Sequence, residues 1–389
     1  MSGRLGQPET YTVVAHWRGG AQTYAALDGV SKVVWERRGG DVASAEITIA
    51  KRDAGAGCCG ALASIEPWAH EITIYRDGSL VWQGPLVDIV EDRTTVTLTA
   101  RDVTGWLDKR ALRKDITGST QPWGKDGADL ILVMAWILLD ALWREGERQD
   151  LNIIPWVTIL GWTGITYRIG DGTDSTGETW RWAEVNMGDQ FRSIAALGAE
   201  WTVVGRRILM GPEPSTDTRP LVRLTDADFL ADLEVNVAGL DTATWAYVEG
   251  GTRKNAQIAE RISYGRHGVD ATNRLEVLLK GSNWTDHGVL KRLATTYLTA
   301  ARPSLVVVKV PDQATLAATA PVRIEELVPG TRFDLAITGE AYCRHPSTGF
   351  NLSQVQVTWE EHKGEQVAVS FLPLRDQSLE TDMGEDTLT

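Results

Sequence analysis

The stretch from residue 70 to residue 112 constrains the fold most, because it has the pattern of a strand meander that ends in a short helix. Asp77-Gly78 suits a tight hairpin turn, since glycine accepts a positive φ. A short amphipathic segment follows Arg101-Asp102 and predicts the start of a helix. The β-prone runs of the meander are residues 71–75, 80–84, 86–90 and 94–100.

The residues before the meander are also β-rich and complete a first domain, predicted at 1–112. Strands are expected at residues 10–16, 33–36 and 43–50, separated by paired glycines. Residues 54–63 are small and glycine-rich, which predicts a loop.

Residues 113–187 have a different character and are predicted to be an inserted helical and Trp-rich subdomain. A long helix is expected at 121–147, with Asp126 or Asp129 as its cap. It is apolar nearly all round as far as Leu139, so it needs cover on most faces. Either the chain's own core or a second subunit could supply that cover.

Tryptophan is unusually frequent, with 16 residues against 5 phenylalanines and 8 tyrosines. Its large contact area and single donor suit cores and interfaces. The candidates for packing or subunit contact are Trp136, Trp143, Trp156, Trp162, Trp180 and Trp182. A second interpretation is that Trp162, Trp180 and Trp182 stack on sugar rings of a glycan.

The remaining sequence predicts a second domain at 188–373 and an acidic, flexible C-terminal segment at 374–389. The first element expected is a helix at 189–197 with a hairpin behind it at 200–210. Near the end, two strands are expected around the Pro-Gly turn within residues 324–337. The other expected elements are a helix at 287–301 and strands at 221–226, 229–237, 244–249, 259–263, 304–310, 352–360 and 365–372.

The charge balance argues against a protein that grips nucleic-acid phosphates, because the net charge is −13 and the pI is about 5.0. The three cysteines, Cys58, Cys59 and Cys343, fit neither a disulfide framework nor a metal pattern. The N-terminus lacks a signal-peptide pattern, and the apolar run Leu130–Leu139 is too short to span a bilayer. We therefore expect synthesis in a cytoplasm and no membrane span.

No catalytic or metal-binding motif is recognisable in the sequence. The six histidines are scattered, and none pairs with another at metal-ligand spacing. Asp171 and Asp174 lie in a polar loop that lacks the EF-hand register, which favours a solvated loop over a Ca²⁺ site. The sequence predicts no catalytic residues, no metal and no cofactor, and favours a structural role over an enzyme.

The stretch Thr73–Trp106 resembles the N-terminal part of tail-tip hub proteins of long-tailed phages, particularly minor tail proteins of siphophages of actinobacteria. The segments that carry the resemblance are Tyr75–Gly78, Leu80–Pro85, Thr97–Asp102 and Trp106–Leu107. The later helix, hairpin and strand pattern agrees with it over most of residues 8–373.

The resemblance implies a mainly β fold with α insertions, built from two tube-type β-barrel domains as in the hub of contractile-tailed phages. It implies a homotrimeric ring at the tail tip of the virion, through which DNA passes without specific binding. The implied partners are the tail tube and distal tail proteins above, and tip or fibre proteins and the tape measure protein below.

Two other functions stay open at this point. One is a receptor-binding tail module that uses the Trp-rich surface to hold glycans. The other is a hub that also degrades the cell wall. The sequence disfavours this second function, because only about 16 residues follow the last expected strand.

Overall fold

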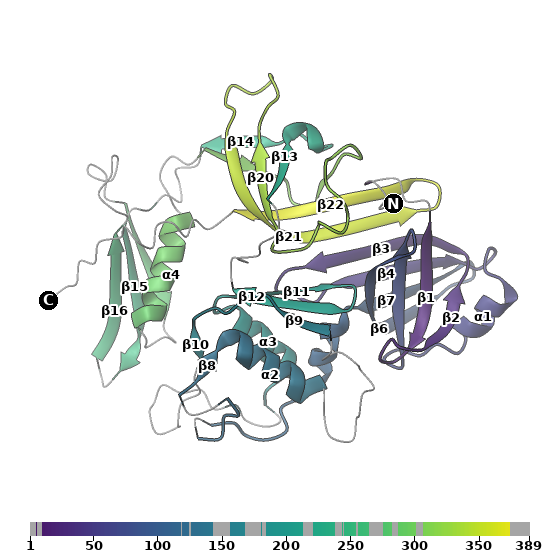
Figure 1. The fold of residues 1–389 in the computed structure, drawn as a ribbon, viewed down its shortest axis with the longest axis horizontal. Helices are drawn as coiled ribbons and strands as arrows, with labels where there is room; N and C mark the ends of the chain where they lie inside the picture. Colours follow the sequence, from purple (N-terminus) through teal and green to yellow (C-terminus); the bar gives the residue numbers. More distant parts are fainter. Residues whose placement is uncertain are drawn as a thin grey trace.

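The computed structural model is mainly β-strand with a few helices, as the sequence predicts (Figure 1). The residues it describes are 5, 10–117, 119–123, 126–142, 156–167, 180, 184–212, 221–237, 243, 245–253, 256–263, 275–281, 287–300 and 306–373. The acidic segment predicted at 374–389 lies outside them. Within these described ranges, no helix combines the length and the apolar character that crossing a bilayer requires.

The first seven strands form one antiparallel run in the order β3-β4-β7-β6-β5-β1-β2. Strand β2 is an element that the sequence analysis did not predict. The seven strands are β1 (Tyr11–Trp17), β2 (Thr23–Leu27), β3 (Val30–Arg38), β4 (Ser44–Ala50), β5 (His70–Arg76), β6 (Ser79–Glu91) and β7 (Thr95–Arg101).

The loop predicted at 54–63 is wrong, because the short helix α1 (Ala56–Leu62) occupies most of it. Alanine is the strongest helix former, and three of the seven helical residues are alanine or leucine. Leu62 packs against the core of the sheet, so tertiary contact holds a helix that is too short to be stable alone.

The meander is confirmed, but two of its expected strands are one. Strand β6 pairs with β5 as far as Pro85 and with β7 from Leu86 onward. Pro85 has no N–H to donate, so it sits at the point where the strand changes partner. A Cβ on Gly84 would lie 1.9 Å from the carbonyl oxygen of Arg101. Only glycine therefore lets the end of β7 approach β6 this closely.

The elements from residue 103 to residue 212 form what we call the helix–hairpin module, which has its own hydrophobic core. In Figure 1 it lies against the long sheet. Its elements are the 3₁₀ helix η1 (Val103–Lys109), β8 (Ala128–Asp129), α2 (Leu130–Leu142), β9 (Val157–Ile159), β10 (Thr166–Tyr167), α3 (Met187–Ala195), β11 (Ala199–Val204) and β12 (Arg207–Pro212).

The helix expected at 121–147 begins later than predicted. Helix α2 starts at Leu130, and the Asp129 carboxylate accepts a hydrogen bond from the backbone N–H of Ile131 at 2.9 Å. Asp129 is thus the cap, one of the two candidates, and Asp126 is not. Eight residues of α2 are buried in the module, so the chain's own core covers most of this apolar helix.

The C-terminal strands extend the same sheet. Strand β21 pairs with β3 over seven residues, from Gln354 opposite Arg38 to Glu360 opposite Lys32. This joins the strands of the predicted first and third domains into one twelve-stranded sheet. The C-terminal strands of this sheet are β13 (Val222–Thr225), β19 (Ala314–Thr315), β20 (Arg332–Ala336), β21 (Ser347–Glu360) and β22 (Gly364–Pro373). Strands β14 (Glu234–Val237) and β18 (Val306–Lys309) pair with each other in a separate two-stranded sheet.

The last hairpin is confirmed, and Gly364 makes its turn with a φ of 81°. One of the two strands expected around the Pro-Gly turn is wrong, because residues 324–326 and 329–330 form turns and residues 324–330 contain no strand. The Glu326 carboxylate accepts a hydrogen bond from the backbone N–H of Arg323 at 2.7 Å, which stabilises a turn there. Only β20, after the turn, is a strand.

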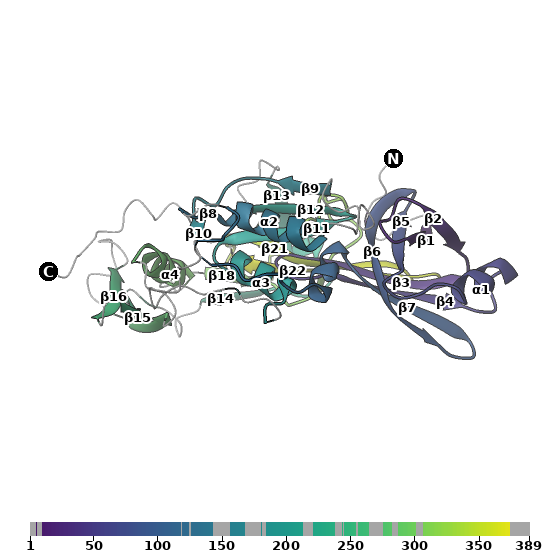
Figure 2. The same ribbon diagram turned by 90° about the horizontal axis from the view of Figure 1, so that it is seen from below.

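A small unit lies at one end of the molecule in both views, with the N-terminal strands at the other (Figure 2). It has a separate core in which α4 packs on β15 and β16. The helix expected at 287–301 is confirmed as α4. The elements of this unit are β15 (Trp245–Arg253), β16 (Ala256–Ser263), β17 (Glu276–Gly281) and α4 (His287–Ala300).

A buried ion pair ties the N-terminal strands to the C-terminal hairpin. Arg76 on β5 donates to Glu365 on β22 at 2.7 and 2.9 Å, and their side chains are 2% and 0% exposed. Tyr11 donates to the same carboxylate at 2.7 Å. Burial, followed by the charge of Glu365, raises the pKa of Tyr11 well above its ordinary value, so Tyr11 stays a neutral donor.

Candidate functional site

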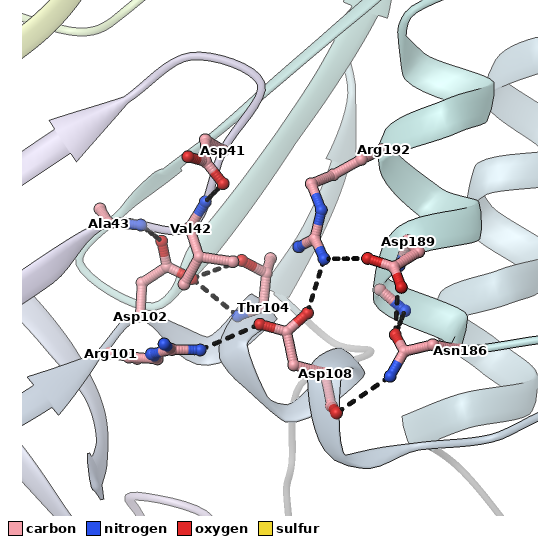
Figure 3. Close-up of polar contacts among 11 residues, drawn as sticks. Asp41, Val42, Ala43, Arg101, Asp102, Thr104, Asp108, Asn186, Asp189 and Arg192 are labelled. Carbon is pink, nitrogen blue, oxygen red and sulfur yellow. Dashed lines mark hydrogen bonds and ion pairs between the residues drawn. The ribbon is translucent and has the colours of Figure 1, made fainter. Parts of the chain in front are cut away.

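A group of polar side chains lies where β7 runs into η1, at the start of the helix–hairpin module (Figure 3). Asp102 caps η1, because its carboxylate accepts from the backbone N–H of Thr104 at 2.8 Å. The same carboxylate accepts from the Ala43 N–H at 2.6 Å. One aspartate thus joins the start of η1 to the turn between β3 and β4.

Asp102 is fully buried, and burial raises its pKa to about 6. The hydrogen bonds from Thr104 and Ala43 act in the opposite direction but do not offset the loss of water. The fold therefore favours the protonated form of this group more than water does. Its contribution to stability is fully present below about pH 4 and is lost as the pH rises through about 6.

Asp108, six residues further on, holds two arginines from different parts of the chain. It accepts from Arg101 at 3.0 Å and from Arg192 of α3 at 2.9 Å. Arg192 also pairs with Asp189 at 2.8 Å. Asn186 caps α3, and its side-chain amide donates to the backbone carbonyl of Asp108 at 3.1 Å. These contacts fasten α3 to η1.

The open space beside these groups is a pocket of about 350 Å³. Its lining residues are Glu36, Arg38, Asp41, Val42, Ser44, Arg101, Asp108 and Arg192. Three arginines face three carboxylates, so the lining is close to neutral. Glu36 is itself engaged, since it accepts from Ser44, Arg38 and Gln354. The pocket is thus a junction of paired charges rather than a site that concentrates one sign of charge.

A second polar contact joins the module to the sheet at the turn between β11 and β12. Arg206 extends from this turn and pairs with Glu71 of β5, and both side chains are buried. Glu71 also accepts from the Gly19 N–H at 3.0 Å and from Gln83 at 3.2 Å. The polar contacts that hold the module therefore include Asp102–Asp108, Arg206, and Thr202, whose hydroxyl donates to the Arg38 carbonyl at 2.9 Å.

Two of the six candidate tryptophans lie together inside the module. Trp136 and Trp180 both pack around Trp123, with ring centroids 5.4 and 5.6 Å from it. Trp180 is 1% exposed, so its ring is not available to a sugar at the surface. Trp143 and Trp182 lie outside the described residues.

Trp156 and Trp162 lie on the surface, 39% and 59% exposed. They flank the edge strand β9, and Ile159 and Leu160 between them are also exposed. The structure thus separates the candidate tryptophans into a buried cluster and an exposed pair.

Sequence reasoning did not identify Asp108, Arg192, Glu71 or Arg206 as a set. Each pair joins residues far apart in the sequence, and nothing in the spacing marks them. A partial signal was present in Arg101-Asp102 and the Gly205-Arg206 turn. Among the described residues, no group of three or more His, Cys, Asp or Glu side chains could hold a metal ion.

No protein-family model matches the sequence, and no curated protein matches it. Solved structures with a similar fold do exist. The tail protein from Neisseria meningitidis MC58 has a TM-score of 0.56 at 11% identity, and the likeness covers 95% of this chain and 97% of that one.

Two prophage proteins are similar over comparable lengths. The 43 kDa tail protein of prophage MuSo2 from Shewanella oneidensis has a TM-score of 0.56 at 11% identity, covering 94% of this chain and 98% of that one. Prophage tail protein gp18 from Listeria monocytogenes EGD-e has a TM-score of 0.51 at 10% identity, covering 95% and 98%. The resemblance predicted from residues 73–106 is confirmed for the architecture: this chain has the fold of phage tail proteins.

Proposed function

We propose that this protein is a structural component of a phage tail, located at the tail tip, where it is the hub that joins the tail tube to the tip. One observation carries the proposal. The likeness to the Neisseria tail protein runs through 95% of this chain and 97% of the other, so no large part of either fold is left over.

The finer part of the proposal is that the strands build two tube-type β-barrel domains and that three copies close a ring. The open strand order supports the ring. In the described part of the sheet, β2 and β13 are the two ends of the order and have a partner on one side only. Exposed strand edges promote aggregation, and neighbouring subunits in a ring would cover them.

The charge supports a channel for DNA that does not bind it. A net charge of −13 repels phosphates, so DNA could move past such a surface without adhering. The proposed partners are the tail tube and distal tail proteins on one side, and tip or fibre proteins and the tape measure protein on the other.

We also propose that the protein catalyses no reaction of its own. The carboxylates at the candidate site support this, because Asp102, Asp108 and Glu36 are each occupied by hydrogen-bond donors. A general acid or base needs a free position at which to meet its substrate. Release of fragments from purified peptidoglycan by the pure protein would contradict this part of the proposal.

A glycan-binding tail module is the second candidate, and the exposure of Trp162 is the observation that favours it. Burial of Trp180 counts against it, because that ring cannot contribute to a sugar-binding surface. Quenching of tryptophan fluorescence by host wall polysaccharide, lost in Trp162→Ala and kept in Trp180→Phe, would support the module. No quenching would exclude it.

The test of the hub is the mass of the purified protein by light scattering at several concentrations, followed by imaging. We expect a particle of three times the 42.7 kDa chain mass with a central hole. The mixture of the protein with purified tail tubes is measured as well, because some rings close only on a partner. Monomers that stay monomeric on the tubes would overturn the hub.

A further inference from the structure

The turn between β11 and β12 inserts a charged side chain into a socket on the first seven strands. We call this the Arg206 socket; it consists of Glu71, Gln83 and the backbone of Gly19 and Gly20. Arg206 is 3% exposed there, although Glu71 is 135 residues away in the sequence. The backbone contacts of this hairpin with the first seven strands and the turn after β3 are short: the bridges of Gly205 with Trp82 and of Thr202 with Gly39, and the Gly40 N–H that donates to the Trp201 carbonyl at 2.8 Å.

The socket is shaped for a guanidinium group. A Cβ on Gly20 would lie 2.7 Å from an Arg206 nitrogen and 2.1 Å from the Gln83 amide, so any other residue would force the ends of those side chains to shift. Gly20 also has a φ of 69°, which favours glycine. Gly205, before Arg206, has a φ of 63° and lets the turn point its next side chain inward. Both sides of the contact thus depend on a glycine.

His16 lies beside this ion pair without a hydrogen bond of its own. It is on β1 directly opposite Glu71 of β5, and it is 8% exposed. By geometry, neither ring nitrogen has a hydrogen-bond partner among the described groups, and the Gly20 backbone acts on the ring only weakly. A buried imidazole with both nitrogens unpaired is costly, because nothing replaces the water it has lost. Protonation of this ring would therefore change the charge balance of the buried ion pair beside it.

The charges around His16 act in opposite directions. Burial has the largest effect and lowers its pKa, so the ring is neutral near pH 7. Glu71 and the backbone of Gly20 favour the protonated ring, and Arg206 opposes it. The other titratable groups nearby are Arg18 in the following loop and His70 on β5, whose ring packs between Trp17 and the edge of Tyr24.

We infer that His16 is a proton-sensitive release for the helix–hairpin module: protonation of its ring puts a second cation against Glu71, which weakens the hold of that carboxylate on Arg206. Two cations then face one buried carboxylate, which leaves an excess positive charge. Moving Arg206 out into water relieves it, because guanidinium regains its hydration there. The hairpin 199–212 would leave the socket while the sheet stays intact.

The direction of the pH effect follows from the same geometry. The docked state holds His16 neutral, whereas an undocked, hydrated His16 binds a proton near its ordinary pKa of about 6.5. Docking is therefore fully stable above that pH and weakens as the pH falls below it. The inference does not depend on the proposed tail function, since it concerns one junction within the chain.

The experiment is hydrogen exchange with peptide-level mass spectrometry on the full chain at about pH 5.8 and about pH 7.5, corrected for intrinsic rates. We expect amides of residues 199–212 to exchange roughly threefold to fivefold faster at the lower pH. The corrected exchange rates of the β3 and β21 amides should be the same at the two pH values. An unchanged hairpin in the wild-type protein would overturn the inference, whatever the variants do.

The variant His16→Gln has no titrating ring, so it should remove the pH dependence of the hairpin. The matched control is His362→Gln, which changes an exposed histidine in the last turn and should keep the wild-type response. A wild-type response in His16→Gln would overturn the role of His16. Should that variant not fold, the His16 C2–H chemical shift of the wild-type protein must titrate together with hairpin exchange, and separate midpoints would overturn it.

Discussion

Two buried arginine–glutamate pairs connect distant parts of this chain, and their surroundings differ. Arg76–Glu365 joins β5 to β22 inside a sheet where β3 and β21 are paired over seven residues. Arg206–Glu71 joins the helix–hairpin module to the same sheet, where the strand contacts are single bridges. Both are arginine–glutamate pairs, but only Arg76–Glu365 lies among continuous strand ladders.

The difference shows what a buried ion pair contributes in each place. Removing water from two charges is costly, so such a pair adds little net stability compared with apolar packing. Within the sheet, strand pairing already determines the register, so Arg76–Glu365 is not needed to define it. At the module, the Arg206 socket determines how the hairpin docks. Breaking either pair should be damaging, but the damage should appear in different places.

The largest effect is expected for Glu365→Ala, because it leaves Arg76 buried without its partner. We expect a loss of about 3–5 kcal/mol in the free energy of unfolding, measured by denaturant titration. The loss should be global, since the site lies in the main core. The control is Glu361→Ala in the exposed turn of the same hairpin, which should change little. A loss of stability confined to the strands around Glu365 would contradict the expected difference between the two ion pairs.

Arg206→Ala leaves Glu71 buried and should have the next largest effect. We expect hydrogen exchange of residues 199–212 to rise at least tenfold, equivalent to about 1.4 kcal/mol or more, while β3 and β21 stay protected. Arg207→Ala, at the neighbouring exposed position, is the matched control. Loss of protection throughout the sheet would show that Arg206–Glu71 stabilises the whole sheet, as Arg76–Glu365 is expected to do.

Asp102→Asn tests the other attachment of the module. Near pH 5 we expect the variant to be about 1–2 kcal/mol less stable, because an amide cannot accept all the N–H groups that Asp102 serves. The gap should narrow as the pH rises through about 6, since only the wild type then bears the cost of a buried charge. Denaturation at several pH values measures it, and a widening gap would contradict the reasoning.

The smallest effect is expected for Arg192→Ala in the charged pocket. Its pairs with Asp108 and Asp189 are partly exposed, so the loss should stay under about 1 kcal/mol and shrink in high salt. Unfolding at low and high salt measures this, and Arg192→Lys should recover part of it. A salt-independent loss of several kcal/mol would show that Arg192 stabilises the fold as a buried ion pair does.

Local signals were read correctly where neighbours in sequence decide the structure. The turn at Asp77-Gly78 forms with φ values of 49° and 77°, and the hairpin around Gly364 pairs as expected. The helices at 189–197 and 287–301 appear as α3 and α4, within two residues at each end. Alternation, helical periodicity and glycine turns are local, and local physics was sufficient there.

The errors occurred where a local preference competes with packing. Residues 56–62 look like a loop, but form α1 against the sheet. The segment from Ile324 to the Pro-Gly turn looks like a strand, but it forms turns, and the Arg323 N–H donates to the Glu326 carboxylate there. Among the candidate tryptophans, composition could not separate buried Trp180 from exposed Trp162. Helix α1 and the tryptophans depend on which part of the chain lies opposite, and this is not written in the neighbouring residues. The turn at Arg323–Glu326 is a local competitor that outweighed the β-strand pattern.

The sequence by itself determined the mainly β class, the meander at 70–112, the acidic balance and the likeness to tail proteins. The first three follow from side-chain period, turn chemistry and composition, which act over a few residues, and the likeness is a resemblance carried by the motifs within Thr73–Trp106. Only the tertiary structure decided that β3 pairs with β21, that Arg76 finds Glu365, and that Arg206 finds Glu71 beside His16. The reason is that long-range pairing depends on shape and charge complementarity between surfaces that exist only once the chain has folded.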